Sequence, residues 1–392
     1  MGNSSRVKRH ETADAKPIIR KTPIILGIEA SCDETAIAIL RANHNGPPDI
    51  LASLISSQDE AHRPYGGVVP EIAARAHMQK ISGLIEKAVR QADLSYTDIT
   101  AVAATAGPGL IGGVIAGLMA AKGLCLSLNI PLIAINHLEG HALSPRLTQN
   151  CPYPYLLLLV SGGHTQILSV TALGKYERLG STIDDALGEA FDKTAKIMDL
   201  GFPGGPKVEA IAKKGDPDTF KLPKPLFGKA HADFSFSGLK TAVLRAWEAS
   251  NKRETDKANL AASFQKTVCA VLDDRLENAM KAYIAKQAGH ISSAPAGTDK
   301  PHRFVVAGGV AANKAIRAAL NSLCETNGFE LIAPPHEFCT DNGAMIAMAG
   351  LEHYAQGNFA DLSCRPRPRW PLDHLSAKQN PASGSGKKGP KS

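Results

Sequence analysis

The sequence predicts an α/β fold of two lobes, and three observations support this prediction. The chain has 392 residues, which is too long for one simple hydrophobic core. Apolar runs of strand length alternate with segments of helical periodicity, an order typical of partly parallel sheets. Two segments far apart in the chain also share one plan: an apolar run, a small tip and a second apolar run. This repeat suggests a duplicated fold with a cleft between its lobes.

Each of the two repeated segments is predicted to form a β-hairpin. In the first, apolar residues 24–29 and 35–40 flank a small, polar tip. In the second, residues 155–160 and 165–170 flank the tip Ser161-Gly-Gly-His164. Backbone N–H groups at such tips can face a phosphate. Hairpins are common, however, so the pair by itself supports duplication and coincidence about equally.

The remaining segments alternate between helix and strand. Residues 77–92 carry apolar side chains at the spacing of an amphipathic helix. The longest apolar run, 110–128, is interrupted by glycines and Lys122, so we expect a packed interior helix rather than a membrane span. Further strands are predicted at 99–103, 131–135, 303–307 and 329–332, and further helices at 259–288, 311–323 and 341–355.

Composition indicates a soluble, cytoplasmic protein without membrane association. Hydrophobic residues make up 44% and charged residues 21% of the chain, as in ordinary globular proteins. The polar N-terminal segment 1–23 lacks the apolar core of a secretory signal. The seven cysteines form no CxxC pair, so we expect reduced thiols. A net charge of +7 permits a nucleic-acid partner without demonstrating one.

The stretch His137-Leu-Glu-Gly-His141 is the most informative one for function. Histidines four apart share one helical face, so both imidazoles can reach one metal ion. Glu139 lies roughly 200° around the helix from both, which excludes the general base of an HExxH metalloprotease. The alternative is a histidine pair on a solvated face, the commoner case for an isolated pair. Asp341 is either a further oxygen ligand or the N-cap of the helix after it.

Three glycine-rich loops fall where strands end, at 161–163, 203–206 and 307–313. The last follows a strand and opens a helix, an arrangement that presents N–H groups to an anion. None has the spacing of a P-loop or a Rossmann fingerprint, and a simple tight turn is the alternative for each. Three such loops in one chain favour a nucleotide site.

Acidic side chains at two places are further candidates. Asp192 could bind ribose hydroxyls or could belong to a helical surface. Asp33 and Glu34 lie at the first hairpin tip, where a loop that faces phosphate would be expected to be neutral. Their charge therefore suggests catalysis or substrate positioning.

Eight motifs lie in order at 27–35, 65–71, 106–109, 137–141, 160–165, 188–193, 234–240 and 338–343. Together they resemble the bacterial tRNA N6-adenosine threonylcarbamoyltransferases, and the resemblance extends from about Ile24 to Trp370. It implies a duplicated, actin-like fold of the ASKHA type, with a nucleotide cleft between two lobes. We predict that residues 23–145, completed by 344–374, form the first lobe and residues 146–343 the second. Residues 1–22 are predicted as a flexible extension and 375–392 as a disordered basic tail.

The resemblance also implies a reaction and its residues. The threonylcarbamoyl group of threonylcarbamoyl-AMP would be transferred to N6 of adenosine 37, in tRNAs that read codons beginning with adenosine. One divalent metal ion, iron(II) in preference to zinc, would be held by His137, His141 and Asp341. Asp33 and Glu34 match an acidic pair linked with catalysis in the family. Substrate contacts are implied for Leu159, Val160, Ser161, Gly162, Gly163, Asp192, Gly205 and Asn313.

The implied partners are the tRNA anticodon loop, a paralogous non-catalytic subunit (TsaB-like) and a small ATPase (TsaE-like). Three other classes of protein are the alternatives. A metalloendopeptidase would need a base that Glu139 does not supply. A small-molecule kinase of the same fold would have no use for two histidines and an aspartate. A non-catalytic scaffold would need no metal site.

Overall fold

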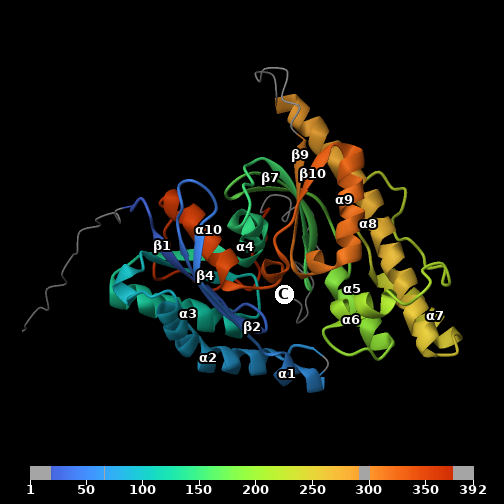
Figure 1. The fold of residues 1–392 in the computed structure, drawn as a ribbon, viewed down its shortest axis with the longest axis horizontal. Coiled ribbons are helices and arrows are strands. Elements are labelled where there is room, and N and C mark those ends of the chain that lie inside the picture. The colour runs from blue at the N-terminus through green and yellow to red at the C-terminus, as the bar shows by residue number, and fades with distance from the viewer. Residues whose placement is uncertain (1–18, 66, 291–300, 374–392) are drawn as a thin grey trace, which may run out of the picture.

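Two sheets of the same topology form the framework of the fold (Figure 1). The computed structural model describes residues 19–65, 67–290 and 301–373. The first sheet has the strand order β3 (Asp49–Ser57), β2 (Glu34–Arg41), β1 (Ile24–Glu29), β4 (Ala101–Gly107), β5 (Leu132–Asn136). The second has the order β8 (Lys175–Ser181), β7 (Thr165–Ala172), β6 (Tyr155–Val160), β9 (His302–Ala307), β10 (Phe329–Ile332).

Strand directions repeat between the two sheets as well. In each sheet three strands pair antiparallel, and the last of them, β1 or β6, is followed by two strands that run parallel to it. The hairpins β1–β2 and β6–β7 are those predicted from the sequence. The predicted α/β fold and its duplicated, actin-like form are therefore confirmed.

The first sheet is covered on both faces. Helices α2 (Pro70–Gln91) and α3 (Ile111–Leu128) pack on one face, and α10 (Gly343–Ala355) packs on the other. In β1, Leu26 and Ile28 belong to the core under α2 and α3, whereas Ile25 belongs to the core under α10. Because both faces are buried, these strands are continuous apolar runs without polar alternation.

The second sheet has its larger core on the side of α8 (Glu254–His290) and α9 (Lys314–Asn327). On its other face, Leu138 and Ala142 of α4 (His137–Leu143) pack against Leu157 and Leu159 of β6. Helices α4 and α10 contact each other and lie between the two sheets (Figure 1). This position puts the histidine pair of α4 between the lobes.

The remaining helices are α1 (Asp59–His62), α5 (Leu187–Ile197), α6 (Gly204–Ala212) and α7 (Ser237–Ala249), and the 3-10 turns are η1 (Arg63–Tyr65), η2 (Tyr96–Asp98), η3 (Ser144–Leu147), η4 (Gly309–Ala312) and η5 (His336–Phe338).

Four predicted helix starts were wrong: α2 and α8 begin earlier than predicted, at Pro70 and Glu254, and two other differences bear on the site. The helix expected from residue 311 begins at Lys314, because η4 precedes it and the Asn313 side chain caps it. The helix expected from residue 341 begins at Gly343, because Asn342 is its N-cap. The carboxylate of Asp341 is therefore free for other contacts.

Helix α3 is not the interior helix that was expected. Its small residues pack inwards, but Ile111, Ile115, Met119 and Leu126 form an exposed stripe, each between 43% and 73% exposed. Among the described residues, α3 alone has a length and composition that would suit a membrane span, features that a helix of a soluble protein can share.

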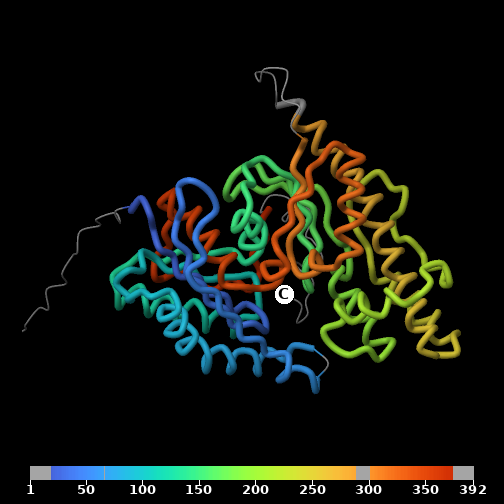
Figure 2. The backbone as a smooth tube through the Cα atoms, in the orientation of Figure 1, coloured from blue at the N-terminus to red at the C-terminus, as the bar shows by residue number. Residues whose placement is uncertain are grey.

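The C-terminal helix returns to the first lobe. Figure 2 shows the red C-terminal segment beside the blue N-terminal strands, and α10 packs on β1, β2 and β4. The predicted lobe boundaries at 145 and 343 remain predictions. The predicted basic tail 375–392 lies outside the described residues, as does most of the predicted extension 1–22.

Candidate active site

A cavity of about 500 Å³ lies between loops of the two lobes. The first hairpin tip and the loop before α10 form one wall, and the second hairpin tip, α5, α6 and η4 form the other. All three glycine-rich loops that were singled out in the sequence reach this cavity. The residues predicted for the site that line it are Asp33, Glu34, His137, Ser161, Gly162, Gly163, Asp192, Gly205, Asn313 and Asp341.

Three predicted residues do not line the cavity. His141 is fully buried behind it, in contact with Asp341. The side chains of Leu159 and Val160 are fully buried in the two cores on either face of β6. A contact from Leu159 or Val160 to a ligand is therefore restricted to backbone atoms.

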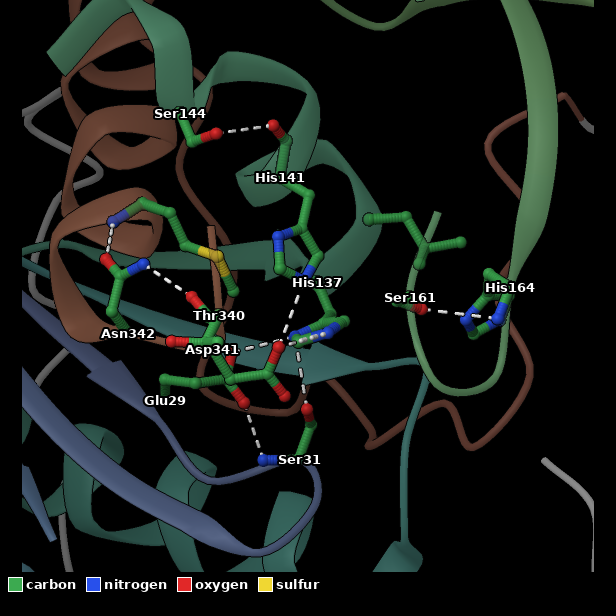
Figure 3. A network of polar contacts seen from close by, with 12 residues as sticks. Glu29, Ser31, His137, His141, Ser144, Ser161, His164, Thr340, Asp341 and Asn342 are labelled. Carbon is green, nitrogen blue, oxygen red and sulfur yellow. Dashed lines mark hydrogen bonds and ion pairs between the residues drawn. The ribbon is translucent and has the colours of Figure 1, made fainter. Parts of the chain in front are cut away.

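His137, His141 and Asp341 form a compact group that can hold a metal ion (Figure 3). Asp341 Oδ1 lies 3.0 Å from His141 Nε2 and 3.5 Å from His137 Nε2. One ligand atom from each residue lies within 4.8 Å of the others. Two imidazoles and one carboxylate are a donor set typical of iron(II) and zinc sites that keep open coordination positions.

The buried carboxylate of Glu29 orients His137. Its Oε2 lies 3.0 Å from His137 Nδ1, and it also accepts hydrogen bonds from Ser31 N and Thr105 Oγ1. Because a carboxylate accepts, Nδ1 carries a proton, which leaves Nε2, the ring nitrogen on the side of Asp341, as the atom that would bind a metal ion. A carboxylate behind a histidine is a regular feature of metal sites.

Charges around this group favour a cation. Burial opposes protonation of His137, but the charges of Asp341 and Glu29 outweigh burial and raise its pKa to about 9. Burial likewise opposes ionisation of Asp341, yet the charge of His137 and the contact with His141 hold its pKa below the usual range. His137 therefore holds a proton tightly. A bound metal ion would supply the positive charge in place of that proton.

His164 stands at the second hairpin tip, on the opposite side of the site from Asp341 (Figure 3). Burial, followed by the positive charges of His137 and His141, lowers its pKa to about 4. The imidazole is therefore neutral near pH 7 and can exchange hydrogen bonds with a ligand.

A buried histidine of α2 holds the first hairpin tip in place. His77 Nε2 donates to the carbonyl of Cys32 at 3.1 Å, and Nδ1 lies 2.8 Å from Thr35 Oγ1. Burial lowers the pKa of His77, so the ring is neutral. Its Nδ1 accepts a hydrogen bond from the Thr35 hydroxyl group. Asp33 and Glu34, which lie between these two contacts, are thereby fixed at the cavity wall.

Asp192 and Asn313 both have structural partners. Asp192 Oδ1 accepts a hydrogen bond from Gly204 N at 2.8 Å at the start of α6. Asn313 Oδ1 accepts from Ala315 N and Ile316 N, while its Nδ2 donates to Gln265. Both side chains cap helices at the cavity wall, so any ligand contact would be additional to this role.

Glu139 has a structural role away from the cavity. It accepts hydrogen bonds from Tyr176 Oη and His353 Nε2, each at 2.7 Å. It thereby joins α4 to β8 and α10. The expectation that it faces away from the histidine pair and cannot serve as a protease base is confirmed.

Sequence reasoning missed Glu29, His77 and His164 as parts of the site. Glu29 could have been noticed as a charged residue at the end of a buried apolar strand, a position where a charge needs partners. His164 stands in the hairpin tip that was already singled out. No local signal marks His77, because its contacts are with residues of another element.

A duplicated actin-like fold, an interlobe cavity and a histidine–histidine–aspartate group define a two-lobed enzyme with a candidate metal site. Solved structures support the fold: HypF of T. kodakarensis matches with a TM-score of 0.55 and 14% identity, over 88% of this chain and 49% of that one. A second match, a full-length HypF with bound phosphate and nucleotide, has a TM-score of 0.53, 14% identity and coverage of 87% and 48%.

Sequence comparison gives the family. The TsaD model, described as tRNA N6-adenosine threonylcarbamoyltransferase, matches residues 49–348. A protein of that name from Maricaulis maris is 53% identical over 94% of this chain and 96% of its own length. Another from Agrobacterium fabrum is 55% identical over 89% and 94%. The chain therefore belongs to the TsaD family of tRNA N6-adenosine threonylcarbamoyltransferases, as the sequence motifs indicated.

Proposed function

We propose that this enzyme transfers the threonylcarbamoyl group from threonylcarbamoyl-AMP to N6 of adenosine 37, in tRNAs that read codons beginning with adenosine. One observation carries the proposal: a TsaD-family chain brings an acidic hairpin tip, glycine loops and a metal-binding group to one cavity between its lobes. The cavity of about 500 Å³ is of the size that encloses small ligands.

The donor would lie along the glycine loops. A side chain added at Gly162, Gly163 or Gly205 would meet no protein atom within 4 Å, so these positions leave room for the nucleotide. Ser161, Asp192 and Asn313 supply polar atoms at the same wall. Leu159 and Val160 would contribute backbone atoms only.

His137, His141 and Asp341 would hold one divalent ion, a donor set that suits both iron(II) and zinc, and we propose iron(II) from the family resemblance. When bound, the ion supplies Lewis-acid stabilisation of negative charge on donor oxygens. Glu29 keeps the His137 ring in the orientation that binding requires.

Asp33 and Glu34 would orient the adenosine amine and take its proton. The N6 lone pair is delocalised into the purine ring, so proton removal and positioning are needed. Burial, followed by the charges of Asp341 and Asp33, raises the pKa of Glu34 well above its ordinary value, the direction in which enzymes tune a carboxyl group for proton transfer. The new C–N bond forms as the C–O bond to phosphate breaks, AMP leaves, and the amine proton passes to the carboxylate.

The partners and location follow from the same proposal. A cytoplasmic enzyme acting on tRNA would work with a paralogous non-catalytic subunit and a small ATPase. The exposed apolar stripe of α3 would offer the paralogous subunit a helical docking face.

The test is mass spectrometry of nucleosides from unmodified tRNA after incubation with this protein, its two partner proteins, threonylcarbamoyl-AMP and metal. We expect threonylcarbamoyladenosine with the wild type and with His44→Ala, an exposed histidine in the loop before β3. We expect at least a hundredfold less with Asp341→Ala or after chelation, since one electrostatic contact in an active site contributes about 10²–10³ in rate. Iron(II) or zinc is then added back to identify the metal.

Folded protein that yields no product with active partners, or that steadily phosphorylates a small molecule from ATP, would overturn the proposal. Thermal melting of each variant separates loss of activity from loss of fold.

A further inference from the structure

A second concavity of about 860 Å³ lies beside the cavity, between the end of β3, α1, η1 and α2. We call it the α1–α2 groove. Asp59 lines both the groove and the cavity, so the two adjoin at this residue. In Figure 1, α1 stands at the edge of the first lobe that faces α5 and α6 of the second. A ligand chain that enters the cavity from this edge would pass the groove.

The groove carries three cations, of which Lys80 donates a hydrogen bond to the carbonyl of Ser57. Arg63, Arg75 and Lys80 line it, against the acidic Asp59 and Glu60. Arg63 and Arg75 are exposed, and neither forms an ion pair within residues 19–65, 67–290 and 301–373. The lining of the groove therefore carries three cations against two carboxylates.

An exposed aromatic residue follows Arg63 in the same 3-10 turn. Tyr65, the last residue of η1, is 64% exposed. Cationic side chains with an exposed aromatic ring are the combination that binds single-stranded nucleic acid, through phosphate contacts and base stacking.

The groove is built on a buried polar network. Gln58 Oε1 lies 3.3 Å from His62 Nε2, and Val69 N donates to His62 Nδ1 at 3.3 Å. Gln58 Nε2 lies 3.4 Å from Nδ1 of the buried His77. This network ties the short helix α1 to α2 and to the loop before α2. The arginines therefore stand on a preorganised surface, which reduces the ordering cost of binding.

We propose that the α1–α2 groove binds the phosphates of tRNA nucleotides next to the target adenosine, with Arg63 and Arg75 as the principal contacts. The proposal rests on the proposed function, since it takes tRNA as the substrate. It assigns the groove the recognition of the RNA strand and leaves the chemistry to the cavity.

The test compares Arg63→Gln, Arg75→Gln and the double variant with Arg90→Gln. Arg90 is an exposed arginine near the C-terminal end of α2, the helix that also carries Arg75, and it pairs with Glu86. The substitution Arg90→Gln therefore removes the same charge outside the groove. Binding of fluorescent tRNA to the complete complex is measured across salt concentrations, together with transfer kinetics. We expect each groove variant to reduce the slope of log K against log salt by about 1, and to raise KM for tRNA with kcat at saturating tRNA unchanged.

Wild-type slope and KM in both single variants would overturn the proposal. If the KM for tRNA is unchanged but more partner protein is needed for full activity, the proposal is overturned. The groove would then be a docking site for a protein. The binding measurement does not depend on catalysis. A wild-type complex that binds tRNA through the groove but makes no product would therefore refute the proposed function alone.

Discussion

At the scale of single residues, the glycine-rich loops around the cavity contain two kinds of glycine. Gly308 has a φ of +96°, and a side chain there would lie 2.3 Å from the carbonyl oxygen of Val160. The protein itself requires this glycine. Gly163 has open space where its side chain would be, so the protein has no packing need for a glycine at that position.

We predict that Gly163→Ala weakens donor binding without weakening the fold. Its melting behaviour should correspond to a stability change within about 0.5 kcal/mol, while KM for threonylcarbamoyl-AMP should rise about tenfold, equivalent to about 1.4 kcal/mol. Gly308→Ala is the matched control and should lower stability by more than about 1 kcal/mol through strain. A wild-type KM in Gly163→Ala would contradict the assignment of this loop to the donor.

At the scale of elements, one carboxylate joins the loop after β8 to the start of α7. Asp184 accepts hydrogen bonds from Ser235 Oγ at 2.5 Å, Ser237 Oγ at 2.7 Å and Phe236 N at 2.8 Å. Burial alone would raise the pKa of Asp184, but these hydrogen bonds together lower it. The ionised carboxylate therefore stabilises the folded state.

The stability that Asp184 contributes should decrease as the pH falls. A carboxyl whose pKa is lower in the folded state stabilises the fold above its unfolded pKa of about 3.9, and this contribution disappears as pH falls through the folded pKa. We predict that Asp184→Asn loses about 1–3 kcal/mol at pH 7, and that the difference from wild type shrinks below about pH 4. Urea unfolding at several pH values checks this.

Asp361→Asn is the control for that series. Asp361 also has a lowered pKa, from its hydrogen bonds with Ser363, but it is exposed and joins no separate elements. Asp361→Asn should therefore differ from the wild type much less than Asp184→Asn does at pH 7, because solvent weakens its contacts. An Asp184→Asn deficit that stays constant down to pH 3 would show that packing, rather than charge, accounts for the loss.

At the scale of the whole molecule, the apolar stripe of α3 lies on the outer face of the first lobe, away from the second sheet (Figure 1). We predict that Met119→Glu and Leu126→Glu weaken association with the paralogous subunit at least tenfold, because a charge would be buried in an apolar contact. Ile284→Glu, an exposed apolar position on α8, is the control. Sedimentation of the mixed proteins checks the result, and equal association of all three variants would place the partner elsewhere.

Local patterns determined much of this protein. Both hairpins, the long helices and the orientation of Glu139 follow from periodicities of a few residues, which backbone geometry imposes wherever the segment lies. The spacing of His137 and His141 likewise put both imidazoles on one face before any tertiary contact was known. Elements without strong periodicity, such as β3, β8 and α7, were not predicted, because tertiary packing selects their conformation.

Tertiary structure alone decided which distant residues complete the site. Asp341 lies 200 positions from His141 and Glu29 lies 108 from His137, and only the packing of α4 and α10 between the two sheets brings them within hydrogen-bonding distance. It also gave the capping roles of Asp192 and Asn313, the buried positions of Leu159 and Val160, and the exposed face of α3. Such contacts depend on how the chain is folded. The sequence around one residue therefore does not show which residue of another segment will contact it.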